Sequence, residues 1–146
     1  MKAHIGVDAD SRLVHTVIGT AANARDVTQA HTLLHGQAQV VFAYTGHQGA
    51  PEREDATGVQ WYIAMRPGKR KAHKHIPWGA LSEQAEKLKA SVRAKVEHPF
   101  RVIKRQFGHV KVRYRGLAKN TAQLMTLFAL SNIWMVRKTL LQGAQA

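Results

Sequence analysis

The chain has 146 residues, 45% of them hydrophobic, which is enough for one domain with a core and argues against a largely disordered protein. It contains no cysteine, so disulfides, thiolate metal sites and cysteine nucleophiles are excluded. Its 22 Lys and Arg outnumber 9 Asp and Glu, and the net charge of +13 favours polyanionic partners, nucleic acid first.

Residues 3–20 are predicted to form a β-hairpin. Two short apolar runs, His4–Val7 and Leu13–Gly19, flank the residues Asp8–Ser11, whose side chains favour a turn. A short amphipathic helix is expected over 25–35, capped by Asn23 or Asp26.

Two apolar, β-branched and aromatic runs follow, at 39–44 and 59–65, and both are typical of strands covered on two faces. The first should be central in a sheet. The stretch at 66–79 is rich in Pro, Gly and Lys, which predicts a mobile basic loop at the surface.

The second half of the chain favours helices. Apolar residues recur at steps of three and four over 80–107, with a kink or restart expected at Pro99 because proline lacks an amide hydrogen. The alternating stretch 110–116 indicates a short strand or an extended arm. The segment 120–141 is apolar nearly all round and predicts a helix packed in an interior or against a partner. The whole chain, 1–146, therefore reads as one mixed α/β domain.

The longest apolar run, "LMTLFALSNIWMV", is too short and too polar for the roughly 20 residues of a membrane span. The start of the chain has no apolar stretch typical of a signal peptide. We therefore expect a cytoplasmic protein, associated with the nucleoid if its partner is DNA.

One stripe of the long predicted helix carries most of the candidate chemistry. Arg93, Glu97, Arg101 and Lys104 are spaced by four, four and three residues, which places them beside the apolar face. A single carboxylate among bases suits a phosphate or a divalent metal. Ordinary helix ion pairs, each worth about 0.2–0.5 kcal/mol, explain the same pattern.

The spacing of Arg93, Glu97 and Lys104 resembles the carboxylate signature of bacterial insertion-sequence transposases of the DDE class. That signature usually has a Tyr three residues before the Arg, where this chain has Ala90. The stretches "RAKVEHPFRVIKRQFGHVKVRYRGLAKN", "MKAHIGVDADS" and "MRPGKR" also resemble segments of this family, so the likeness covers essentially the whole chain.

The resemblance implies an RNase H-like mixed sheet flanked by helices. It also implies two Asp and one Glu that hold two Mg²⁺ ions, which activate a nucleophile and stabilise the leaving oxygen during phosphodiester cleavage. Glu97 matches the third carboxylate and is the one metal ligand that the resemblance finds retained. The basic residues expected to contact the DNA of the transposon ends are Arg93, Arg101, Lys104, Arg105, Lys111, Arg113 and Arg115.

Tyr44 stands where the family has its second Asp. That Asp lies in a stretch resembling "FADAGYQG", and this chain has "FAYTGHQG", with each difference reachable by one base change. A phenol with a pKa of about 10 stays protonated at neutral pH and is a poor Mg²⁺ ligand. Relaxed selection explains the substitution, and a sequencing error is the alternative.

The family's first Asp belongs to a strand upstream of the segment that resembles "MKAHIGVD". We therefore expect Met1 to be an internal methionine of a longer protein, and the sheet to lack its first, central strand, which would leave two edges without a partner. Asp8 and Asp10 fall in the predicted turn and are not substitutes.

The leading hypothesis is a C-terminal piece of a DDE transposase that takes part in DNA transposition but binds no Mg²⁺ productively and cuts no DNA by itself. A non-catalytic DNA-binding protein, which associates with itself or inhibits a full-length transposase, is a second hypothesis. A decayed open reading frame without function is a third.

Overall fold

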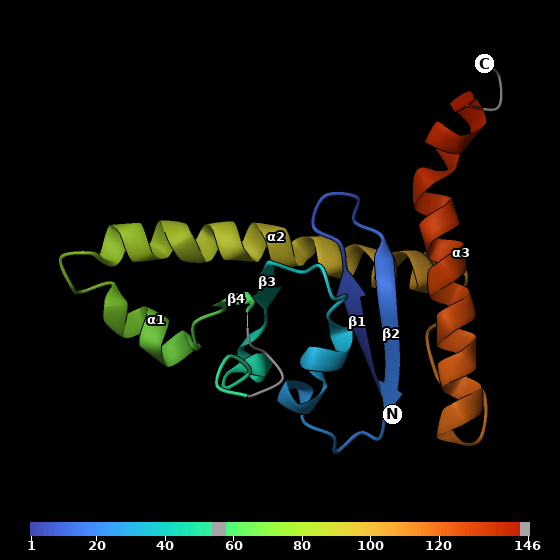
Figure 1. Ribbon diagram of the computed structural model, residues 1–146, viewed down its shortest axis with the longest axis horizontal. Coiled ribbons are helices and arrows are strands. Elements are labelled where there is room, and N and C mark those ends of the chain that lie inside the picture. Colours follow the sequence, from blue (N-terminus) through green and yellow to red (C-terminus); the bar gives the residue numbers. More distant parts are fainter. Residues whose placement is uncertain (54–57, 144–146) are drawn as a thin grey trace. The chain divides into compact units, whose positions relative to one another are not determined.

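The fold is taken from a computed structural model that describes residues 1–53 and 58–143 (Figure 1). Short strands and 3₁₀ helices fill the first half of these residues and two long helices fill the second, which confirms the prediction of a mixed α/β protein. The chain divides into two compact units. Unit 1 comprises Met1–Ala24 and the described residues from Lys95 onward, and unit 2 comprises Arg25–Ala94.

Unit 1 is built on a β-hairpin, which occupies the segment predicted for one. The strands β1 (Lys2–Val7) and β2 (Val14–Thr20) are antiparallel, with a bulge between Gly6 and Val7. The Asp8 carboxylate accepts hydrogen bonds from the Ser11 amide and hydroxyl, both at 2.6 Å, and these bonds fix the turn. They also hold the pKa of Asp8 below its usual value.

The helix α3 (Leu117–Gly143) runs alongside β2 (Figure 1). The core of unit 1 forms here, because apolar residues of the hairpin and of both long helices meet: Ile5, Val14, Ile103, Leu124 and Phe128. The ring of Phe128 meets that of Phe100 edge to face, with centroids 5.2 Å apart. At Gly19 of β2 the strand passes so close to α3 that a Cβ would collide with the Thr121 side chain.

A side chain of α3 also bonds to the backbone of the hairpin. The Asn132 Oδ1 accepts the Val14 amide at 2.9 Å, and its Nδ2 donates to the Val14 carbonyl at 2.8 Å. The amide of Asn132 thus pairs with Val14 in the way that a neighbouring strand would.

The helix α2 spans Gly79–Arg105 and contains Pro99 in its interior, so the helix does not restart there. The Pro99 side chain is almost completely buried, and the packing of its ring compensates for the missing amide hydrogen bond. The expected strand or arm at 110–116 is neither strand nor helix but an irregular connection to α3.

Unit 2 contains two short parallel strands, β3 (Val40–Ala43) and β4 (Gln60–Ile63). The rings of Phe42 and Tyr62 stack on neighbouring strands, with centroids 5.2 Å apart. Among the described residues, β3 pairs only with β4, and the hairpin of unit 1 forms a separate sheet.

The helix expected over 25–35 is instead a pair of 3₁₀ helices, η1 (Asp26–Gln29) and η2 (His31–Leu33). The Thr28 hydroxyl donates to the Arg25 carbonyl at 2.7 Å, and the Thr32 hydroxyl donates to the Gln29 carbonyl at 2.8 Å. Such local bonds compete with the α-helical pattern and favour the tighter turns.

The segment predicted as a mobile loop contains a helix, α1 (Pro67–His73). Pro67 lies at its first turn, where the fixed φ of proline favours helix initiation. The guanidinium of Arg70 then binds both carboxylate oxygens of Glu83 on α2, at 3.0 and 2.5 Å, and this bidentate pair holds α1 against that helix. None of the helices within 1–53 and 58–143 is long and apolar enough to cross a membrane.

Candidate functional site

The turn after β3 presents Tyr44. Strand β3 ends at Ala43, Tyr44 precedes the 3₁₀ helix η3 (Thr45–His47), and the His47 amide donates to the Tyr44 carbonyl at 2.9 Å. Gly49 completes the turn with a φ of 88°, a left-handed conformation that glycine adopts without strain. The sequence thus places a side chain at the end of a strand, where catalytic residues of α/β proteins commonly lie.

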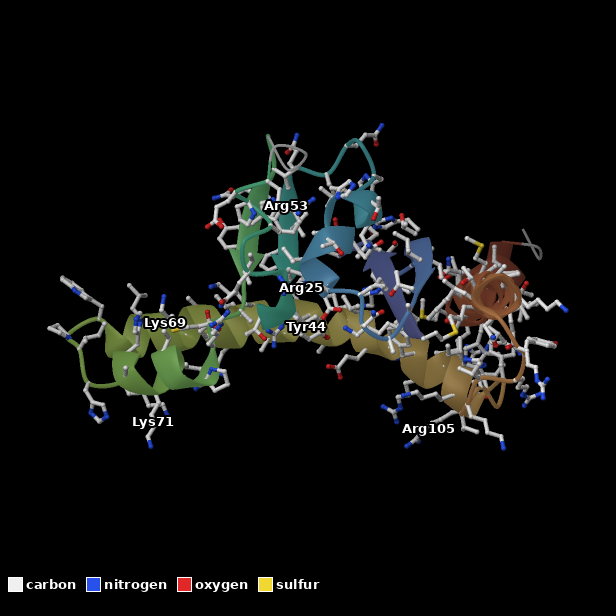
Figure 2. The ribbon with its side chains drawn as sticks, turned by 90° about the horizontal axis from the view of Figure 1, so that it is seen from below. Arg25, Tyr44, Arg53, Lys69, Lys71 and Arg105 are labelled. Atoms are coloured by element: carbon white, nitrogen blue, oxygen red, sulfur yellow. The ribbon has the colours of Figure 1, made fainter. Side chains whose placement is uncertain are left out.

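The side chain of Tyr44 packs against Arg93 of α2, and Figure 2 shows Tyr44 next to this helix. The Arg93 guanidinium lies 4.7 Å from the centroid of the ring, a cation–π contact. The Tyr44 hydroxyl also donates a long hydrogen bond of 3.5 Å to the Arg93 carbonyl. The sequence singled out both residues, and the structure brings them together.

The Nε of Arg93 is buried and has no hydrogen-bond acceptor among the described residues. Burial of a charged donor without an acceptor is costly, and proteins usually satisfy such a group. A carboxylate is the strongest acceptor for a guanidinium. The Nε of Arg93 is therefore a donor that a carboxylate would satisfy and that the ring of Tyr44 does not.

Unit 2 buries an acid that the sequence prediction missed. Glu86 of α2 is 5% exposed, and its carboxylate accepts the Met65 amide at 3.0 Å and the Lys89 ammonium at 2.7 Å. Lys89 also donates to the Ile63 carbonyl at 3.2 Å, so the pair holds α2 at the end of β4. Burial works to raise the pKa of Glu86, but the bonds from Lys89 and Met65 outweigh it and the pKa is lowered. The three-residue spacing of Glu86 and Lys89 on a predicted helix was the sequence feature that could have indicated this pair.

The other predicted residues of α2 belong to unit 1. Glu97 is exposed there, as are Arg101, Lys104 and Arg105. Arg101 and Arg105 line a cleft in this unit, and Figure 2 shows Arg105 projecting from the end of α2. Glu97 and Lys104 are not among the residues that line it.

The last three predicted DNA contacts, Lys111, Arg113 and Arg115, are exposed in the irregular connection between α2 and α3. The Arg113 guanidinium donates to the Gly108 carbonyl at 3.3 Å, which links it to the end of α2. Burial, helped by the nearby charge of Arg113, lowers the pKa of His109 below its usual value. His109 therefore favours its neutral form, and the positive charge here comes from the Lys and Arg side chains.

The acidic side chains that the structure describes are not grouped as a metal centre. Within the part of the chain that the structure describes, no three His, Asp or Glu side chains are grouped so that they could hold a metal ion. Tyr44 offers a phenol with an arginine over its ring, and both features are unfavourable for a divalent cation. The donor set does not fit a pair of Mg²⁺ ions.

Comparison with protein families gives a match over most of the chain. A family model described as "Transposase DDE domain" matches residues 1–133, which is most of the chain. No solved structure matches the chain.

Proposed function

Because the chain belongs to the transposase DDE domain family, we propose that it binds DNA in transposition and does not cut DNA by itself. Transposition is the function that the family indicates. The observation that supports the absence of cleavage is the pairing of Tyr44 with Arg93.

Phosphodiester cleavage by two metals needs hard oxygen ligands with negative charge. At neutral pH a phenol is uncharged, so Tyr44 cannot supply the charge that a carboxylate brings. The guanidinium of Arg93, 4.7 Å from the ring centroid, adds a positive charge close by, and this repels a divalent cation. Glu97 then remains as a single acid of the expected three, and one carboxylate holds Mg²⁺ only weakly.

The DNA-binding part of the proposal rests on charge. Arg101, Lys104 and Arg105 of α2 are exposed, as are Lys111, Arg113 and Arg115 in the connection to α3, and the chain carries a net charge of +13. Exposed Lys and Arg side chains on one element are typical of surfaces that contact backbone phosphates. Such contacts position the protein on a duplex without reading its sequence.

A nicking assay tests the proposal. Supercoiled plasmid is incubated with the chain and Mg²⁺ or Mn²⁺, and a gel-shift measurement on the same preparation reports DNA binding. We expect binding without nicking for the wild type and for Glu97→Gln. Metal-dependent nicking that Glu97→Gln abolishes would show an active enzyme and overturn the proposal.

A second role, association with an intact transposase, is favoured by the surface of α3. Several large apolar side chains of this helix are exposed: Met125, Leu130, Ile133, Leu140 and Leu141. Co-expression with an intact family member and co-purification at low salt tests this role. We expect Ile133→Lys to abolish co-purification and Lys138→Ala to preserve it. Failure of the wild-type chain to co-purify would remove this role.

A further inference from the structure

Unit 1 contains a basic cleft of about 700 Å³. It lies where the turn of the hairpin, the C-terminal part of α2 and the C-terminal half of α3 come together. Its basic residues come from all three elements: Arg12, His98, Arg101, Arg105 and Arg137. None of the described residues that line it is acidic, so the cleft is strongly positive.

Arg137 is held in place before any ligand arrives. Its guanidinium lies 3.9 Å from the centroid of the Trp134 ring, and its Nη1 donates to the Trp134 carbonyl at 2.5 Å. A guanidinium has five N–H donors in a fixed plane, so one such bond leaves donors for an anion. A side chain that is already ordered loses less entropy on binding.

Arg12, which lines the cleft, occupies an unusual backbone position. Its φ is 65°, and it is the single non-glycine residue with a positive φ in the part of the chain that the structure describes. The left-handed region costs a residue with a Cβ about 1–2 kcal/mol, and glycine or asparagine would fit the turn better. The arginine side chain therefore has a role that the turn itself does not require.

Two acids lie near Arg12 in the sequence, Asp8 and Asp10. The Asp8 carboxylate is already bonded to the amide and hydroxyl of Ser11. Asp10 is exposed and does not line the cleft. Neither residue supplies a counter-charge inside the cleft.

Arg101 and Arg105 lie one turn apart on α2. Like charges at this spacing destabilise a helix by about 0.2–0.5 kcal/mol. An anion bound between both side chains attracts each of them and so offsets this repulsion. Arginine also binds phosphate oxygens in a bidentate manner, which a lysine cannot do.

We propose that the cleft formed by Arg12, Arg101, Arg105 and Arg137 binds consecutive phosphates of a nucleic-acid strand. This inference rests on the proposed function, and it adds the hairpin turn and α3 to the DNA-contacting surface. The chemistry that it recognises is a row of phosphate groups, so inorganic tripolyphosphate is a simple competitor.

The test compares two double variants that remove the same charge. Arg12→Gly/Arg105→Ala removes two arginines of the cleft, and the glycine also relieves the strained turn. Lys69→Ala/Lys138→Ala removes two exposed lysines outside the cleft as a control. Thermal melts are used to check that both variants fold. Fluorescence anisotropy with a labelled DNA duplex over a salt series gives the affinity and its salt slope, with and without tripolyphosphate.

We expect the cleft variant to bind DNA at least about tenfold more weakly, with a log–log salt slope smaller by about 2, because two phosphate contacts are lost. The control should change the affinity about threefold or less, through long-range charge alone. Tripolyphosphate should displace DNA from the wild type and bind the cleft variant poorly.

The other outcomes separate the inference from the proposed function. If both double variants weaken DNA binding equally, the proposal for the cleft is overturned and the proposed function stands. If tripolyphosphate binds the wild type more tightly than the cleft variant but DNA binds neither protein, the cleft is a phosphate site. That result overturns both the nucleic-acid ligand and the proposed function. Binding of neither ligand overturns both proposals.

Discussion

At the residue scale, the ring of Tyr44 supports the guanidinium of Arg93. We expect Tyr44→Ala to lower the free energy of unfolding by about 1–3 kcal/mol, because both the cation–π contact and the packing of the ring are lost. Tyr44→Phe keeps the ring and should lower the free energy of unfolding clearly less. Urea titrations of the three proteins measure the difference, and equal losses in the two variants would contradict the importance of the ring.

A second residue-scale prediction concerns acid. The pKa of Glu86 lies below its ordinary value of 4.5, since the bonds from Lys89 and Met65 outweigh the effect of burial. The stabilisation from this carboxylate is therefore complete above about pH 5 and is lost as the pH falls through the lowered pKa. We expect Glu86→Gln to lower the free energy of unfolding by about 1–3 kcal/mol at pH 7 and to make it less sensitive to pH below 5.

The matched control for Glu86 is Glu83. Its pair with Arg70 is more exposed, with side-chain exposures of 26% and 38%, and the bond to Arg70 likewise lowers the pKa of Glu83. Solvent screens exposed pairs of this kind, so Glu83→Gln should have only a small effect on the free energy of unfolding. If the free energy of unfolding changes with pH in the same way for wild type and Glu86→Gln between pH 3 and pH 5, the role given to Glu86 is excluded.

At the element scale, the close approach of β2 to α3 depends on Gly19. A Cβ at this position would collide with the Thr121 side chain, and overpacking of this kind costs about 1–3 kcal/mol. We expect Gly19→Ala to lower the melting temperature and Gly19→Ala/Thr121→Ala to restore part of the loss. Gly143→Ala is the control, since a Cβ there would meet no described side chain or neighbouring element within 4 Å. A Gly19→Ala protein as stable as wild type would show that the two elements are not in tight contact.

Element boundaries were predictable where a long apolar period dominated, as in α2 and α3. The boundaries of short elements were less predictable. The helix α1 is paired to α2 by Arg70 and Glu83, which are 13 residues apart, and η1 and η2 contain local bonds from threonine hydroxyls. The burial of Pro99 is likewise a property of packing that no local pattern reveals.

At the scale of the whole molecule, the excess of basic residues predicts DNA binding that is strongly salt-dependent. If 6–10 phosphates are contacted, the affinity falls by about 10³–10⁵ between roughly 50 and 200 mM salt. Anisotropy titrations on duplexes of unrelated sequence measure this dependence, and we expect similar affinities for all of them. A flat salt dependence would show that phosphate contacts do not carry the binding.

The candidate site was predictable in part because its motif residues are close in the sequence or follow a recognisable strand. Tyr44 could be found in this way. Arg12 and Arg137 could not, because they are 125 positions apart and meet in one cleft only through the packing of α3 on the hairpin. An arginine in a turn and an arginine three residues after a tryptophan do not by themselves indicate a binding site. Only the fold brings the two side chains together.

The bonds between Asn132 and Val14 give this protein a built-in spectroscopic reporter. The amide hydrogen of Val14 is held by a side chain of α3, so its chemical shift and its rate of exchange with solvent respond to any movement of that helix. Asn132 lies only two residues before Trp134 in the cleft. A single cross-peak in an amide NMR spectrum therefore follows the helix as ligand is added, without any label near the ligand itself.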